Sequence, residues 1–157
     1  NQAHEDLAQQ FKLNLPLREY AALVHGHMDS PKGTINMPLG RDPHNRIKFG
    51  VQPDGKASVT HFKVEKEFKS LSLLKVQLET GRTHQIRVHA QHIGHPVAGD
   101  DKYGNEAVNQ RLRTQMGLRR LFLHAASLEF ALDDGQQPYL LNAPLPPELT
   151  EVLDRLG

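Results

Sequence analysis

Two strand-like segments separated by only two residues constrain the fold of this chain most strongly. Polar and apolar residues alternate over residues 57–68, as in an antiparallel strand, and residues 71–78 form a second apolar-rich segment. The pair therefore predicts a β-hairpin.

The rest of the chain continues in short elements. Further strands are expected over residues 17–24, 34–37, 121–130 and 139–142. Helices are expected over residues 5–11, from residue 83 to about Gly94, and from Pro146 to the end, whereas residues 100–117 look irregular and polar. Residues 17–24 carry apolar side chains on both faces, so both faces should be at least partly buried. We predict an α+β fold, with a mixed, mainly antiparallel β-sheet core and flanking helices.

Composition excludes several classes of protein. A chain of 157 residues predicts one domain. It contains no cysteine, which excludes disulfides and zinc–thiolate sites, and its apolar runs are too short to span a membrane. The chain has 19 Lys and Arg residues and 18 Asp and Glu residues, so its net charge is close to zero. Any basic surface must therefore come from the arrangement of these residues.

Residues 80–89 are the strongest candidate for a functional site. The expected helix follows a strand and a Thr-Gly pair, and its polar side chains are Arg82, His84, Gln85 and Arg87. The backbone N–H groups and the dipole of a helix N-terminus favour an anion. Arg87 lies at the margin of the apolar stripe, where it is either a cation held for a carboxylate or phosphate or a structural arginine. The residues alone leave open whether the anion is a substrate or another part of the protein.

Other polar residues give weaker signals. Tyr20 lies within an expected strand and is by itself most simply a core tyrosine. Among the ten histidines, His89 and His92 have helical spacing, but no carboxylate lies on their helix, so we do not expect a metal site. Asp100 and Asp101 are adjacent and point apart, which favours a turn over a catalytic pair. Residues 111–120 are basic and fit either nucleic-acid contact or a solvated loop.

Five segments, taken together and in order, resemble a known family. They are residues 18–24, 55–62, 80–89, 94–100 with Tyr103-Gly104, and 121–125. They resemble the RluA-type pseudouridine synthases, which isomerise uridine in structured RNA. Residues 41–43 are more similar to the branch that modifies large-subunit ribosomal RNA.

The resemblance implies specific roles. Tyr20 matches the family's active-site tyrosine, which stacks near the target base and is proposed to take a proton. Arg87 matches the basic residue that pairs with the catalytic aspartate, with Ile86 as its packing partner. The expected RNA-binding residues are Arg82, His84, Gln85, Arg41, Arg46 and Lys48. The implied partner is structured RNA, with large-subunit ribosomal RNA favoured, in the cytoplasm, without metal, organic cofactor or membrane.

One departure from the family pattern is large. The family's nucleophile lies in a His-Arg-Leu-Asp motif upstream of the tyrosine strand, and this chain has no such motif. Residues 1–157 are therefore expected to be the C-terminal portion of a catalytic domain, truncated before the nucleophile and inactive alone. With the missing segment restored, Arg87→Ala is expected to remove most activity but leave the fold standing. The alternative is a non-catalytic RNA-binding module.

Overall fold

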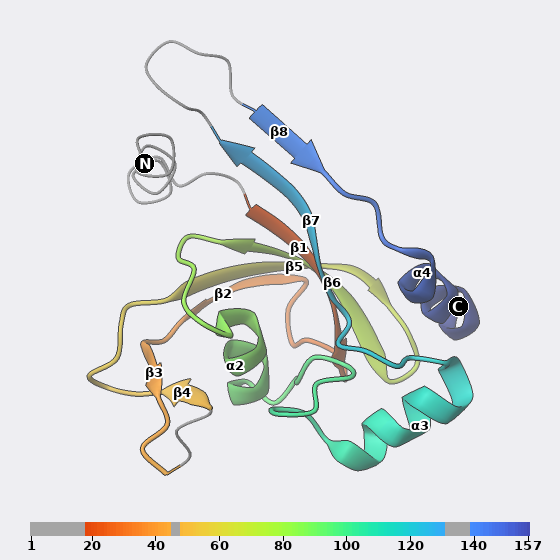
Figure 1. Cartoon of the computed structure of the whole chain (residues 1–157), viewed down its shortest axis with the longest axis horizontal. Helices are drawn as coiled ribbons and strands as arrows, with labels where there is room; N and C mark the ends of the chain where they lie inside the picture. The colour runs from red at the N-terminus through yellow and green to blue at the C-terminus, as the bar shows by residue number, and fades with distance from the viewer. Residues whose placement is uncertain (1–17, 45–47, 131–138) are drawn as a thin grey trace.

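The computed structural model describes residues 18–44, 48–130 and 139–157, which form a six-stranded antiparallel sheet with helices against it (Figure 1). The strands of this sheet are β1 (Arg18–His25), β2 (Lys32–Asn36), β5 (Val59–Glu67), β6 (Leu71–Leu78), β7 (Leu123–Phe130) and β8 (Tyr139–Asn142), in the order β2-β5-β6-β1-β7-β8. A smaller antiparallel pair consists of β3 (Leu39–Arg41) and β4 (Phe49–Val51). The helices are α2 (Gln85–His92), α3 (Glu106–Met116) and α4 (Pro147–Leu156). This architecture confirms the predicted α+β class.

The hairpin expected from residues 57–78 is present as β5 and β6. The two strands pair antiparallel from Thr60 opposite Leu78 to Glu67 opposite Ser72, with a register shift between Val64 and Lys66. The Phe68 N–H closes the turn on the Leu71 carbonyl at 2.8 Å. The predicted hairpin is therefore confirmed.

Strand β1 is the only described strand that pairs with both β6 and β7, and both of its faces are buried, as predicted. Ala22 and Val24 pack in one apolar cluster with Ile86 and Ala90 of α2. Leu23 points the other way, into a cluster formed largely by α3, α4 and Phe122. Figure 1 shows α2 beside the β3–β4 pair, and α3 near α4 on the other side of the molecule.

Helix α3 was not predicted, because residues 100–117 looked irregular. Its apolar residues are sparse, and only Leu112 is buried. Its ends nevertheless carry ordinary helix signals: the Asn105 side chain accepts the Val108 N–H, and Gly117 closes the helix with a positive φ of 74°. Capping and a single buried leucine define this helix better than hydrophobic periodicity does.

The other boundaries differ from the sequence-based expectations by a few residues. Helix α2 begins at Gln85 rather than Thr83, because His84 adopts a left-handed conformation that cannot continue the helix. Gly94 and Pro96 follow its end, as expected. The helix expected over residues 5–11 lies outside the described residues.

Candidate active site

A buried hydrogen-bond network fixes the start of α2 against the sheet. The Gln85 side chain is 2% exposed, and its amide group makes four hydrogen bonds. Its Nε2 donates to the Val59 carbonyl and to Thr60 Oγ1, both at 2.9 Å, while Oε1 accepts from the Thr80 hydroxyl and the Arg82 N–H. Because the amide has no remaining hydrogen-bonding capacity, Gln85 anchors the helix.

This placement corrects the prediction that Gln85 contacts RNA. The sequence showed a polar residue at a helix start, which is compatible with solvent or ligand exposure. The structure shows instead that Gln85 turns inward, where Thr60 and Thr80 satisfy it. A buried, fully bonded amide has no free group to offer RNA.

His89 continues the network one turn later. It is completely buried, its Nε2 lies 2.9 Å from the Met37 carbonyl and its Nδ1 lies 2.8 Å from Thr60 Oγ1. A carbonyl can only accept, so Nε2 carries the proton and the Thr60 hydroxyl donates to Nδ1. Burial lowers the pKa of His89, although the hydrogen bond to Met37 opposes that shift. The imidazole is therefore neutral in the folded protein at neutral pH.

A pH-dependent loss of stability follows from this depressed pKa. Unfolded His89 takes up a proton near its ordinary pKa of about 6.5, whereas folded His89 does so only at lower pH. The free energy of unfolding should therefore fall as pH drops below about 6.5, with His89 contributing up to about 1.4 kcal/mol per pH unit until its folded pKa is reached. In urea unfolding at several pH values, His89→Gln should reduce this slope. His92→Gln, at an exposed position on the same helix, should leave the slope nearly unchanged, and equal slopes in all three proteins would contradict the assignment.

Arg87 emerges from α2 on the opposite side of this anchor and binds Asp100. Its Nε and Nη2 donate to the two carboxylate oxygens of Asp100 at 2.8 and 2.7 Å, which is a bidentate ion pair. The Asp100 side chain is fully buried, and that of Arg87 is 15% exposed. The Arg87 guanidinium also lies 5.1 Å from the centre of the Tyr103 ring.

The partner of Arg87 was not foreseen. The family resemblance implied that Arg87 pairs with an aspartate outside the chain, yet one edge of its guanidinium binds Asp100 within it. Its Nη1 makes no hydrogen bond to any residue in the described ranges. Arg87 is thus clamped by Asp100 and retains one donor group for a second partner.

Asp100 is held by the turn as well as by Arg87. Its carboxylate accepts the backbone N–H groups of Lys102 and Tyr103, both at 3.0 Å. Burial would raise its pKa, but the hydrogen bonds from Arg87 and these backbone groups outweigh burial, so the pKa of Asp100 lies below its usual value. Hydrogen bonding to Asp100 in turn raises the pKa of Arg87. The prediction that Asp100 organises a turn is confirmed.

The turn that contains Asp100 also contacts α3 and the segment that precedes β7. The Asn109 side chain accepts the Gly99 N–H and donates to the Asp100 carbonyl, at 2.9 and 2.8 Å. Gly99 has a positive φ of 80°, and a Cβ there would lie 2.2 Å from the Arg120 carbonyl oxygen. The close approach of these backbones explains why glycine stands before Asp100.

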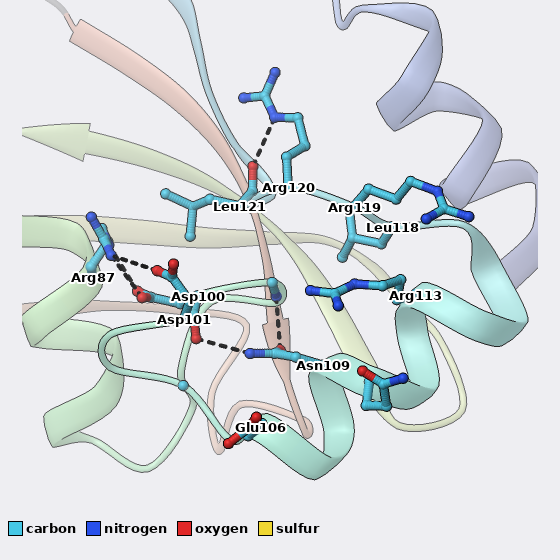
Figure 2. A pocket seen from close by; sticks show the side chains of 13 residues that line it. Arg87, Asp100, Asp101, Glu106, Asn109, Arg113, Leu118, Arg119, Arg120 and Leu121 are labelled. Atoms are coloured by element: carbon cyan, nitrogen blue, oxygen red, sulfur yellow. Dashed lines mark hydrogen bonds and ion pairs between the residues drawn. The ribbon is translucent and has the colours of Figure 1, made fainter.

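A cleft of about 520 Å³ opens beside the Arg87–Asp100 pair. Figure 2 shows the pair on one side of the cleft, and Arg113 of α3 extending into it from the other side. Its lining also includes Arg119, Arg120 and Leu121. The cleft is therefore polar, partly basic and open to a ligand of nucleotide size.

Tyr20 lies on the same face of the sheet as α2. It shares a face of β1 with Ala22 and Val24 and packs, half-buried, against the cluster that contains Ile86. Leu121 packs against this cluster and also lines the cleft. The Tyr20 hydroxyl makes no hydrogen bond within the described part of the chain, unlike the satisfied core tyrosine considered from the sequence.

The remaining predicted RNA-binding residues occupy the β3–β4 pair and the segment before α2. Arg41 and Arg82 line a second cavity, of about 430 Å³, together with Phe49. The Arg41 guanidinium lies 4.9 Å from the centre of the Phe49 ring, and Arg82 Nε donates to the Ala57 carbonyl. Lys48 precedes β4, where its carbonyl accepts the Asp42 N–H. The prediction for Arg46 lies outside the described residues.

Three residues that contribute to this region were not predicted from the sequence. Asp100 clamps Arg87, and Tyr103 and Phe49 enclose His84. Asp100 and Tyr103 lie within the segments that carried the family resemblance, so their positions were a usable signal. Phe49 lies outside those segments, and only the tertiary fold brings it to α2.

The described ranges contain neither a cluster of metal ligands nor a membrane-spanning helix. No group of three or more His, Asp or Glu side chains is arranged there to hold a metal ion. No helix in those ranges is long and apolar enough to cross a bilayer.

Comparison with known proteins identifies the family. The sequence profile described as RNA pseudouridylate synthase matches residues 1–92, more than half of the chain. The chain belongs to this family of RNA pseudouridine synthases.

Individual relatives extend the match over nearly the whole chain. The RNA pseudouridine synthase YlyB of Bacillus subtilis is 42% identical over 154 residues, covering 98% of this chain and 48% of the relative. The ribosomal large subunit pseudouridine synthase C of Vibrio cholerae is 39% identical over 150 residues, covering 96% of this chain and 47% of the relative. The chain therefore spans about half the length of the curated relatives it matches.

A solved structure agrees with the fold. Human RNA pseudouridylate synthase domain containing 1 superimposes with a TM-score of 0.77 at 27% identity, over 90% of this chain and 60% of the human chain.

Proposed function

We propose that this chain is the C-terminal portion of an enzyme that isomerises uridine to pseudouridine in structured RNA. The observation that carries the proposal is Arg87, whose guanidinium is clamped by Asp100 with one donor group left over. The resemblance of residues 80–89 to the family supports assigning Arg87 the basic position of the catalytic pair. The nucleophilic aspartate would come from a segment that precedes residue 1. We propose large-subunit ribosomal RNA as the substrate, because relatives at about 40% identity are named ribosomal large subunit pseudouridine synthase C. The proposed location is the cytoplasm.

In this proposal Arg87 keeps the incoming aspartate ionised. A nearby guanidinium lowers the pKa of a carboxyl group and fixes its orientation, and an ionised carboxylate is the nucleophilic form. Asp100 supports this role because it prevents Arg87 from rotating away. Tyr20 would provide an aromatic surface and a hydroxyl for the flipped uridine, since an enzyme that acts on a base must take that base out of the stack.

The basic residues outside the cleft are proposed to hold the RNA backbone. Arg41 and Arg82 line the cavity beside β3 and β4, and Lys48 directly precedes β4. Arg46 is included by its place in the sequence between Arg41 and Lys48. Guanidinium and ammonium groups suit phosphate oxygens. His84 lies between this region and Arg87, in contact with Phe49 and with the Tyr103 ring that also packs against Arg87.

Expression of the complete gene tests the proposal. The protein encoded with the codons upstream of Asn1 and the 157-residue chain are each incubated with transcribed large-subunit ribosomal RNA, and pseudouridine is quantified by mass spectrometry of the digested RNA. The longer protein should form pseudouridine and the 157-residue chain should not. Pseudouridine formed by the 157-residue chain would refute the proposed position of the nucleophile. RNA binding without conversion by the longer protein would favour a non-catalytic RNA-binding module.

A further inference from the structure

His84 combines a strained backbone with a tightly held side chain. It has φ 56° and ψ 23°, and it is the only residue other than glycine with a positive φ in the described ranges. It occupies the N-cap position of α2 without making a side-chain capping bond. Glycine or asparagine would adopt this conformation more readily. Such strain persists where the surroundings enforce it, and it clusters at functional sites.

Two aromatic rings hold the imidazole of His84. The Phe49 ring meets it edge to face, with centres 5.7 Å apart and planes at 82°. The Tyr103 ring meets it similarly, with centres 5.5 Å apart and planes at 73°. The same Tyr103 ring packs against the Arg87 guanidinium, so His84 and Arg87 share one wall.

Hydrogen bonds at Tyr103 fix the proton on His84. The Tyr103 hydroxyl oxygen accepts the Phe49 N–H at 2.9 Å and lies 2.8 Å from His84 Nδ1. Among the described residues, the Tyr103 hydroxyl proton finds its acceptor in His84 Nδ1, so Tyr103 donates and Nδ1 accepts. The proton of the neutral imidazole is therefore on Nε2, which bonds to no described residue.

The environment also keeps this imidazole uncharged. Partial burial lowers the pKa of His84, and the positive charges of Arg87 and Lys102 lower it further, against a smaller opposing effect of Asp100. Arg87 can therefore bind a charged group, and His84 beside it offers an uncharged N–H donor.

We propose that His84 is a substrate-binding residue that donates its Nε2–H to a carbonyl oxygen of the target uracil. The proposal rests on the proposed function, because it assumes that uridine enters beside Arg87. Uracil presents carbonyl oxygens on its edge, and a flipped base is read through hydrogen bonds to that edge. An uncharged donor with a fixed tautomer suits a neutral carbonyl, whereas the neighbouring Arg82 suits a phosphate. Phe49 and Tyr103 act as positioning residues for the ring.

The tautomer can be measured directly. Long-range proton–nitrogen NMR correlations of the imidazole, assigned to His84 by their loss in His84→Gln, should show Nε2 protonated and Nδ1 unprotonated at neutral pH. Tyr103→Phe removes the hydroxyl that donates to Nδ1 and should give a mixture of tautomers. A proton on Nδ1 in the unmodified protein, or a charged ring at pH 7, would overturn the proposal.

The contact with a neutral base can be separated from a contact with phosphate by its salt dependence. With the complete gene product and transcribed large-subunit ribosomal RNA, His84→Ala should lower kcat/KM by about 3- to 10-fold, as expected for one lost neutral hydrogen bond. His84→Asn, which tolerates the left-handed backbone and retains an uncharged N–H donor, should recover part of this loss. The slope of log affinity against log salt should stay unchanged in both variants, whereas Arg82→Gln should make it shallower by about 0.7–0.9.

The outcomes distinguish the two levels of the proposal. A slope that falls in His84→Ala as it does in Arg82→Gln would show a charged phosphate contact and would refute the base contact. Unchanged kcat/KM in His84→Ala, with turnover by the unmodified protein, would refute the role of His84 alone. No pseudouridine from the unmodified complete protein would refute the proposed function and the base contact together.

Discussion

Replacing Asp100 by alanine should lower the free energy of unfolding by about 3–5 kcal/mol, the range found when one partner of a buried ion pair is removed. The substitution leaves Arg87, whose side chain is only 15% exposed, without its bidentate partner. It also deprives the Lys102 and Tyr103 N–H groups of their acceptor. Because unsatisfied buried groups retain their full desolvation cost, the loss should exceed that of an ordinary surface ion pair. Urea unfolding followed by circular dichroism measures the difference.

The neighbouring aspartate is a matched control for this prediction. Asp101 lies 3.9 Å from Arg87 Nη2, but its side chain is 95% exposed. Asp101→Ala should therefore change stability by no more than about 0.5 kcal/mol. Similar losses in the two variants would mean that the buried geometry of Asp100 contributes little.

The pH dependence of the Asp100 contribution has a definite sign. The pKa of Asp100 is lower in the folded protein than in the unfolded chain, where it is about 3.9. The stabilisation is thus fully present above about pH 4 and is lost as pH falls through the lower folded pKa. The stability gap between the unmodified protein and Asp100→Ala should stay constant from pH 5 to 8 and narrow only in stronger acid.

The sequence predicted those elements whose side chains follow a simple period. The β5–β6 hairpin and the doubly buried β1 were both foreseen, because alternation and turn residues are local signals. Helix α3 was missed because a single buried leucine leaves almost no periodic pattern. Local capping by Asn105 and Gly117 was present in the sequence but was outweighed by the polar composition around it.

The candidate site shows a different limit. Residues 80–89 were correctly singled out as unusual, but the sequence could not say which polar side chains turn inward. Gln85 and His89 bind the sheet, whereas Arg87 and His84 lie at the other side of the helix start. That division depends on Thr60, a residue that only the tertiary fold brings to the helix. A polar motif can therefore mark a site while several of its members serve the fold.

Arg87→Gln in the complete protein should reduce single-turnover pseudouridine formation by about 10²–10³-fold, the range for removing one electrostatic partner at a reacting centre. Arg87→Ala is expected to leave the fold standing, but either substitution should reduce stability, because it leaves the buried Asp100 carboxylate without a cation. Activity must therefore be measured with saturating protein at a temperature where circular dichroism shows the variant to be folded.

Two further variants separate catalysis from stability. Asp100→Asn retains the Arg87 charge but removes the carboxylate that orients it, so it should be destabilised and yet keep more activity per folded molecule than Arg87→Gln. Arg155→Gln removes an exposed arginine of α4 that donates to the Met116 carbonyl, and its turnover should match that of the unmodified protein. If Arg87→Gln, once folded, turned over RNA at a near-native rate, Arg87 would be only the structural partner of Asp100. A deep loss confined to Arg87→Gln would instead support a role for Arg87 at the reacting centre beyond its ion pair with Asp100.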